Sequence, residues 1–158
     1  MPHKKIIPFS HAQALAENLH RKKKKIVFTN GTFDFLHLGH VTYLQKAKSL
    51  GNILIVGVNT DRSVKSYKDP NRPVNSQTDR IQVLTALECV DYAVLFDEPT
   101  PLKLILQIMP DVLVKGSDWK KHQIAGAKEV EAGGGKVVRV RLVPGKSTTR
   151  LIEKIKKL

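Results

Sequence analysis

The pattern of apolar and polar positions along this 158-residue chain predicts strands and helices that follow one another in turn. Short apolar runs bounded by polar residues or glycine predict buried strands at 25–30, 52–59, 92–96, 111–116 and 136–143. Between them, apolar residues recur at helical spacing over 40–50, 76–90, 101–109, 124–134 and 147–158. Strands that alternate with helices imply an α/β fold with a Rossmann-like, doubly wound parallel sheet in three layers, α/β/α.

A further helix is expected before the first strand, over residues 11–23. Ser10 would serve as its N-cap, because a serine side chain can accept a hydrogen bond from the first helical turn. Ala14, Leu15 and Leu19 would form its inner face.

A single domain is expected over residues 1–158, because no linker, internal repeat or low-complexity tract divides the chain. Residues 1–24 would form a helical extension, and residues 25–158 the Rossmann-like core. The 41% hydrophobic content suits a globular protein. No apolar run is long enough to span a membrane, and no segment resembles a signal peptide.

The one cysteine, Cys89, cannot form an internal disulfide, which fits a cytoplasmic location. Because Cys89 falls in the predicted helix 76–90, we interpret it as a packing residue and not as a nucleophile.

The charge is strongly positive, with 27 Lys and Arg residues against 14 Asp and Glu, a net +13. Such a surface favours polyanions. Part of the excess lies at 21–25 and 154–157, where solvated helix ends are the simpler interpretation. Few aromatic residues occur, and they do not interleave with the basic runs. Nucleic acid is therefore not the expected partner, although a basic nucleic-acid-binding α/β module remains an alternative.

The segment "TNGTFDFLHLGH", residues 29–40, follows the first predicted strand. Gly31 would allow a turn that bulkier residues resist. His37 and His40 are spaced i, i+3, which places them on one face of the first helical turn. A helix N-terminus attracts anions, and Gly39 leaves a phosphate room to approach. This spacing predicts a cradle for a polyphosphate whose charge grows in a transition state.

The histidine pair has two other interpretations, a metal site and a buried core pair. A metal site usually requires a third ligand and often i, i+4 spacing. Asp34 is the available third group, and its fit is poor. A buried core position is the usual interpretation of a single histidine, but it is less expected for two histidines on one helical turn beside a glycine.

The segment "PGKSTTRLI", residues 144–152, resembles part of a P-loop. The pattern needs a glycine at position 140, which holds valine, and only eleven residues follow Ser147. A P-loop ATPase is therefore excluded. Ser147, Thr148 and Thr149 still open a helix that can hold phosphate, although a plain helix cap would explain them equally well if they stood alone.

Two further segments have both a functional and a structural interpretation. In the polar segment 61–75, Lys65, Lys68 and Arg72 could close over a phosphorylated substrate or could belong to an exposed basic loop. In "VKGSDW", residues 114–119, the end of a predicted strand could border a nucleotide or form a simple turn.

The motif "NGTFDFLHLGH" resembles the first signature of the nucleotidylyltransferase superfamily, and the late "STT" resembles its second. Within that superfamily the chain is similar to the heptose 1-phosphate adenylyltransferases over roughly residues 10–156. The matching stretches are "FTNGTFDFLHLGHVTYL", "LIVGVNTDRSVK", "RPVN", "LTALECVDYAV", "PDVLVKGSDW", "IAGAKEV…GGKV" and "STTRLIEKI". So long a match is far more specific than the H-x-G-H motif alone.

The resemblance implies transfer of AMP from ATP to D-glycero-D-manno-heptose 1-phosphate, giving ADP-heptose and pyrophosphate for lipopolysaccharide core synthesis. Mg²⁺ would accompany the ATP with no direct protein ligand. A homodimer is expected, as is a separate heptose kinase, because many relatives carry a sugar-kinase domain ahead of this one.

The expected site residues follow from the motifs and the resemblance together. The catalytic residues would be His37, His40, Lys65 and Lys68. The ATP would contact Thr32, Phe33, His37, Gly39, His40, Arg72, Lys115, Gly116, Asp118, Ser147, Thr148 and Thr149. The acceptor would contact Asn30, Asp34, Asn59 and Asp61, with Asp34 orienting either the heptose or a histidine.

Two departures from related families bear on specificity. Glycerol-3-phosphate cytidylyltransferases carry R-Y-V-D and R-T-E-G-I-S-T, where this chain reads "ECVD" at 88–91 and "LVPGKST" at 142–148. Phosphopantetheine adenylyltransferases carry a proline where this chain has Phe35. The cytidylyl branch is therefore disfavoured, while GTP or CTP as the nucleotide, or a glycerol 3-phosphate-like acceptor, remain alternatives. The resemblance does not explain the high positive charge.

Overall fold

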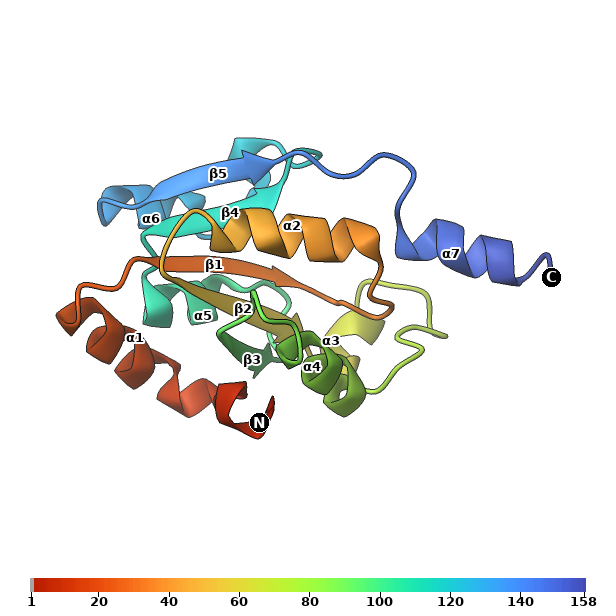
Figure 1. Cartoon of the computed structure of the whole chain (residues 1–158), viewed down its shortest axis with the longest axis horizontal. Helices are drawn as coiled ribbons and strands as arrows, with labels where there is room; N and C mark the ends of the chain where they lie inside the picture. The colour runs from red at the N-terminus through yellow and green to blue at the C-terminus, as the bar shows by residue number, and fades with distance from the viewer. Residues whose placement is uncertain (1) are drawn as a thin grey trace.

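A five-stranded parallel sheet organises the chain, with strand order β3-β2-β1-β4-β5 (Figure 1). This computed structural model describes the backbone of residues 2–158 and the side chains of residues 4–158. The strands are β1 Ile26–Gly31, β2 Ile53–Asn59, β3 Tyr92–Phe96, β4 Val112–Gly116 and β5 Lys136–Val140. The predicted doubly wound parallel sheet is confirmed.

Helices cover both faces of the sheet, which makes three layers (Figure 1). One face carries α1 Ala12–Arg21, α5 Leu102–Ile108 and α6 Ala127–Ala132. The other carries α2 Leu38–Lys48 and α4 Gln77–Thr85. The remaining helices are α3 Asp61–Lys65, α7 Thr148–Ile155 and the short 3-10 helices η1 Pro2–Lys5, η2 Phe9–His11 and η3 Lys121–Gln123.

The central strand β1 divides the core by the pleat of its side chains. Ile26 and Phe28 point into the cluster under α1, α5 and α6, whereas Val27 points into the cluster under α2 and α4. All three are fully buried, as expected for a strand covered on both faces. The strand order reverses between β2 and β4 on the two sides of β1, so a crevice is expected at its carboxyl end.

The N-terminal helix differs from the prediction. Ser10 lies in η2, and α1 begins after His11 with no side-chain cap. Leu19 is buried and Leu15 packs against the core, as predicted, but Ala14 is exposed, and Ala12 and Ala16 are buried in its place. These positions follow the helical period just as well as the predicted set, since alanine fits either side of the helix. Through them α1 packs on the sheet as part of one helical layer.

Other helix and strand boundaries differ from the predictions, because turns and loops contain residues that were predicted to be helical or extended. Helix α4 ends at Thr85, so Cys89 lies in the following turn; it is half-buried and packs against the core there. Strand β5 stops at Val140, and α6 begins only at Ala127. The predicted loop 61–75 contains the helix α3, which Thr60 caps by accepting a hydrogen bond from the Ser63 amide.

Helix α7 projects from the end of the sheet at which β1 ends (Figure 1). None of its eight residues is buried. Within residues 2–158, no helix has the length and apolar character needed to cross a bilayer.

Candidate active site

A cleft opens at the carboxyl ends of β1 and β4, where the strand order reverses. It has a first lobe of about 360 Å³ and a second lobe of about 480 Å³. The two lobes share the lining residues Asn30, Gly31, Thr32, Lys68, Lys115 and Trp119. The first lobe adds Phe33, His37, Gly39, His40, Tyr43, Gly116, Asp118, Leu142, Val143, Lys146, Ser147, Thr148 and Thr149. The second adds Asn59, Tyr67, Pro99, Thr100, Pro101, Gln123 and Ala125.

The predicted histidine pair lies in the first lobe. His37 is the N-cap of α2, and its Nδ1 accepts a hydrogen bond from the Gly39 amide at 3.1 Å. The rings of His37 and His40 stack with centroids 3.9 Å apart and an angle of 29° between their planes. Since Nδ1 of His37 is an acceptor, the proton of its neutral ring is on Nε2, ready for donation.

Both histidines are held neutral at pH 7. Burial, followed by the charge of Lys146, lowers the pKa of His37. Burial, followed by His37 and with a smaller contribution from Lys68, lowers the pKa of His40 to about 4. The Nδ1 atom of His40 is buried and has no hydrogen-bond partner among the described residues. The imidazoles therefore offer hydrogen bonds, while the positive charge of the cleft comes from lysines.

Close packing around the motif explains its glycines. A Cβ on Gly39 would lie 2.9 Å from the His37 ring and 3.1 Å from Cβ of Lys146. Gly31 does not adopt a left-handed conformation, contrary to the prediction; a Cβ there would lie 3.0 Å from the Phe33 ring. Phe33 itself has φ 51°, a strained value for a bulky residue, and its ring lies 5.4 Å from that of His40.

The start of α7 forms the opposite wall of the first lobe. Ser147 caps the helix by accepting a hydrogen bond from the Arg150 amide at 3.2 Å, and Thr148 and Thr149 are its first residues. Two helix N-terminal ends, those of α2 and α7, therefore border one lobe. Their free N–H groups and dipoles favour an anion between them.

The segment 67–75, which we call the strap, is tied to the motif at both ends. The hydroxyl groups of Tyr67 and Thr32 are hydrogen-bonded at 2.7 Å. At the other end, the Asp34 carboxylate accepts hydrogen bonds from Arg72 Nε at 2.8 Å and from the amides of Val74 and Asn75. The Arg72–Pro73 peptide is cis. Between these anchors, Lys68 lines both lobes.

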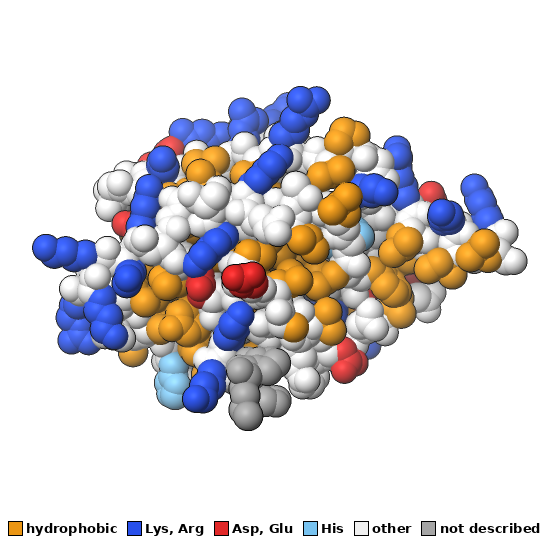
Figure 2. Space-filling model, viewed as in Figure 1, with side chains coloured by type: hydrophobic (Ala, Val, Ile, Leu, Met, Phe, Trp, Pro, Cys, Tyr) orange, Lys and Arg blue, Asp and Glu red, His pale blue; other side chains and the backbone are white. Residues whose placement is uncertain are grey.

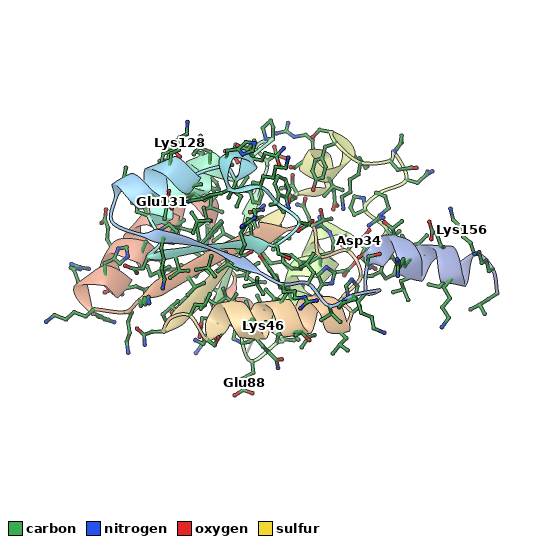
Figure 3. The ribbon with its side chains drawn as sticks, turned by 90° about the horizontal axis from the view of Figure 1, so that it is seen from above. Asp34, Lys46, Glu88, Lys128, Glu131 and Lys156 are labelled. Carbon is green, nitrogen blue, oxygen red and sulfur yellow. The ribbon has the colours of Figure 1, made fainter. Side chains whose placement is uncertain are left out.

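Asp34 lies outside both lobes, which differs from its expected place at the acceptor. Its side chain is 1% exposed, and in Figure 3 it is labelled at the end of the molecule from which α7 projects. Burial would raise the pKa of Asp34, but hydrogen bonds from Asn75, Val74 and Arg72 outweigh burial and lower it. The structure gives this carboxylate three internal partners and assigns it to the strap.

Three other predicted residues also lie outside the two lobes. Lys65 is exposed on α3. Asp61 pairs with Arg80 at 2.8 Å, and Arg72 lines an outer groove between the strap and α7. Asn59 lines the second lobe only. The cleft brings together the other predicted residues, namely Asn30, Thr32, Phe33, His37, Gly39, His40, Lys68, Lys115, Gly116, Asp118, Ser147, Thr148 and Thr149.

The buried side chain of Arg80 holds the floor of the cleft in place. Its guanidinium donates to the carbonyl oxygens of Thr32 at 2.5 Å and Asn59 at 2.7 Å. It thereby fixes the ends of β1 and β2 relative to each other and, through Asp61, the start of α3.

Sequence reasoning missed several lining residues. Lys146 lies in "PGKSTT", where rejecting the P-loop removed the reason to consider the lysine. Tyr43 supports the floor through hydrogen bonds with Thr29 at 2.8 Å and the Val114 carbonyl at 3.2 Å, and burial raises its pKa to about 12. No sequence signal distinguishes Tyr43 from an ordinary core residue.

The donor set of the cleft bears on metal binding. Of the residues that line the two lobes, Asp118 is the only one with a carboxylate. No cluster of three histidine, cysteine, aspartate or glutamate side chains suited to a metal occurs among the described residues. A hard cation such as Mg²⁺ would therefore take most of its oxygen ligands from a bound polyphosphate.

Known proteins resemble the chain over most of its length. The chain is 54% identical over 144 residues to the bifunctional protein HldE of Citrifermentans bemidjiense, and 51% identical over 142 residues to that of Methylobacillus flagellatus. These alignments cover 91% and 90% of this chain but 29% of each relative, so the chain spans less than a third of their length.

Solved structures share the fold. A lipopolysaccharide core biosynthesis protein from Thermoplasma volcanium matches with a TM-score of 0.63 and 30% identity, over 76% of this chain and 97% of that chain. The pantoate-beta-alanine ligase of Francisella tularensis matches with a TM-score of 0.62 and 19% identity, over 97% of this chain and 78% of its own, a likeness of fold alone. A family model described as cytidylyltransferase-like matches residues 28–153. The chain therefore belongs to the cytidylyltransferase-like family.

Proposed function

We propose that the protein transfers AMP from ATP to D-glycero-D-manno-heptose 1-phosphate and releases pyrophosphate. The observation that carries the proposal is one cleft with two lobes that share six lining residues, of which the first lobe holds the stacked histidine pair. The sequence similarity to heptose 1-phosphate adenylyltransferases and to the HldE proteins gives the substrate class.

The first lobe suits the ATP. Its two helix N-terminal ends, the two neutral imidazoles and Lys146 favour a polyphosphate. Gly116 lets the chain turn close to Asp118, because a Cβ at Gly116 would collide with the Asp118 carboxylate. Asp118 and Trp119 then border the part of the lobe left for the nucleoside.

The second lobe suits a polyhydroxylated acceptor. The amide side chains of Asn30, Asn59 and Gln123 line it, with the aromatic rings of Tyr67 and Trp119. Amides both donate and accept hydrogen bonds, as sugar hydroxyls require. Oδ1 of Asn30 is buried and has no partner among the described residues, so it can accept a hydroxyl hydrogen.

The chemistry needs no general base, because a sugar phosphate is already an anion at neutral pH. One of its oxygens attacks the α-phosphorus of ATP, and the bond from the α-phosphorus to the oxygen that bridges to the β-phosphorus breaks. Positioning and electrostatic stabilisation supply the rate. His37 and His40 donate hydrogen bonds to phosphate oxygens, and Lys68 neutralises charge where the lobes meet. Mg²⁺, held by ATP oxygens, would supply further charge neutralisation.

Three further features belong to the same proposal. The single, half-buried cysteine suits the reducing cytoplasm. A kinase that phosphorylates the heptose at C1 must supply the acceptor. A homodimer is expected, and the unburied α7 offers an apolar surface for it.

A pyrophosphate-release assay tests the proposal. ATP with heptose 1-phosphate should release pyrophosphate and form ADP-heptose, while GTP, CTP and glycerol 3-phosphate should react much more slowly. Faster turnover of CTP with glycerol 3-phosphate would move the protein to the cytidylyl branch. ATP-insensitive, salt-dependent binding to duplex DNA, with no pyrophosphate release, would favour the nucleic-acid-binding alternative.

A further inference from the structure

We propose that Lys115 is a catalytic residue that binds the oxygens of both reacting phosphates at the boundary between the two lobes. This inference deepens the proposed function and rests on it. From sequence alone, Lys115 is not distinguishable from an ordinary nucleotide contact or a turn residue.

The position of Lys115 on the sheet places it at the reaction centre. It is the penultimate residue of β4, the strand next to β1 at the point where the strand order reverses. It lines both lobes, a property shared by only five other residues of the described chain, of which Lys68 is the other cation. Lys115 comes from the floor of the cleft, whereas Lys68 comes from the strap.

Lys115 is a nearly buried cation without a matching anion. The residue is 9% exposed, and no carboxylate of the described residues forms an ion pair with it. The face of the Trp119 ring lies 5.1 Å from Nζ, and the Asp118 carboxylate attracts the ammonium group without forming an ion pair with it. A buried ammonium group without a partner destabilises a fold, so its presence calls for a ligand. An anion between the lobes would supply the missing charge.

The electrostatics of the free protein agree with this geometry. Burial lowers the pKa of Lys115 to about 8, and Asp118 only partly opposes that effect. Lys68, Lys146 and the two neutral histidines face the same cleft and add no negative charge. A phosphate bound beside Nζ would raise the pKa again and keep the ammonium protonated through the reaction.

The chemical role follows from the charges that meet in the cleft. The attacking oxygen and the α-phosphate are both anionic and repel each other. An ammonium group between them reduces this repulsion and stabilises the charge that spreads over the α-phosphate oxygens in the transition state. Lys115 neither gains nor loses a proton, and the pyrophosphate departs with the electrons of the broken bond.

The test compares Lys115→Met with Lys120→Met, an exposed lysine that lines neither lobe. Without ligand, the melting temperature of Lys115→Met should equal or exceed that of the unchanged protein, because an uncompensated buried charge is lost. ATP–Mg²⁺ should raise it much less than it raises that of the unchanged protein, because the α-phosphate loses a partner. The value of kcat/KM should fall about 100-fold or more, the scale of one lost transition-state donor. Lys120→Met should behave as the unchanged protein.

Two results would overturn the inference. One is a folded Lys115→Met protein that ATP–Mg²⁺ stabilises as much as it stabilises the unchanged protein. The other is a Lys115→Met protein that melts at a lower temperature or fails to fold, because Lys115 would then be a structural residue. Neither readout uses heptose 1-phosphate: the first uses ATP–Mg²⁺ and the second uses no ligand. Both therefore stand even if the unchanged protein does not act on heptose 1-phosphate, a result that would contradict the proposed function alone.

A pH profile adds a readout that a structural role would not affect. In the unchanged protein, kcat/KM should decline above pH 8 as Lys115 of the free protein loses its proton. In Lys115→Arg, whose guanidinium stays charged, this part of the decline should disappear. Partial burial and Arg72 also lower the pKa of Lys68. Since Lys68 is present in both proteins, the difference between the profiles reports Lys115, and identical profiles would contradict the assignment.

Discussion

At the scale of single residues, the histidine pair combines close stacking with neutrality. Rings whose centroids are 3.9 Å apart would repel each other if both were charged. Each ring therefore contributes a hydrogen bond and not a full charge. We predict that His40→Ala lowers kcat for ATP by about 100-fold or more, since a donor to the transition state is lost. Steady-state kinetics on a folded variant checks this, and turnover like that of the unchanged protein would remove His40 from the mechanism.

The same histidine makes the fold sensitive to acid. Its pKa is about 4 in the folded protein and near 6.5 in the unfolded chain. The unfolded chain therefore binds a proton first, and stability falls as the pH drops from about 6.5 to about 4. At about 1.4 kcal/mol per pKa unit, the loss is on the order of 3 kcal/mol. Urea unfolding at pH 7 and pH 4.5 should show a smaller difference for His40→Gln; an equal difference in both proteins would contradict the prediction.

The residue-level predictions succeeded where the signal was local. His37, Gly39 and His40 lie within one helical turn, so their spacing predicted that they come together. Residues 147–149 are distant in sequence, and the resemblance to the superfamily, not spacing, assigned them to the same site. The position of Asp34 could not be predicted in this way, because its backbone partners lie about forty residues away, at Val74 and Asn75. No periodicity reveals a carboxylate that accepts distant backbone amides.

At the scale of elements, the strap shows how a polar segment acquires a fixed position. Tyr67→Phe removes the hydrogen bond to Thr32 and keeps the aromatic ring. A net loss of about 0.5–1.5 kcal/mol is expected, so kcat/KM should fall about 2- to 10-fold as Lys68 becomes less well placed. Trypsin should also cleave the strap faster. Tyr92→Phe on β3, which lines neither lobe, is the matched control, and equal effects of the two variants would contradict a role for the strap.

Two serine residues that cap different helices allow fold stability and ATP binding to be tested separately. Ser76 caps α4, which is packed on the sheet, whereas Ser147 caps α7, which has no buried residue. Each cap contributes about 1 kcal/mol to its helix. Ser76→Ala should therefore lower the melting temperature by a few degrees and leave the KM for ATP unchanged. Ser147→Ala should raise that KM several-fold with little change in melting temperature. Calorimetry and kinetics check the pair, and the reverse pattern would exclude α7 from ATP binding.

Element boundaries were less predictable than the elements themselves. Helix α3 was missed because five residues with only one apolar side chain, Val64, carry little periodic signal. Of the three residues predicted for the inner face of α1, only Ala14 was misplaced. Alanines at 12, 14 and 16 all fit an apolar face, and only packing against the sheet selects among them. The parallel sheet with helices on both faces, by contrast, followed from the alternation of strands with helices and the right-handed crossover.

At the scale of the whole molecule, the net charge of +13 disfavours dimerisation, whereas the exposed apolar side chains of α7 favour it. Ile155 is 53% exposed, and Figure 2 shows hydrophobic side chains gathered where α7 projects. A second copy could bury this surface, but two molecules with the same large charge repel each other. Salt screens that repulsion, so dimerisation should strengthen between low and high salt. ATP binding should weaken over the same range, because salt also screens the attraction between lysines and phosphates.

The two salt dependences can be measured on one sample. Sedimentation velocity at about 50 mM and about 500 mM salt should show more dimer at the higher salt concentration. Ile155→Asp should abolish the dimer at both concentrations, because a charge replaces an apolar contact. Lys128→Ala, on the exposed surface of α6, lowers the net charge by one unit, as Ile155→Asp does, and should instead favour the dimer by reducing repulsion. Equal losses in the two variants would show that α7 is not the contact surface.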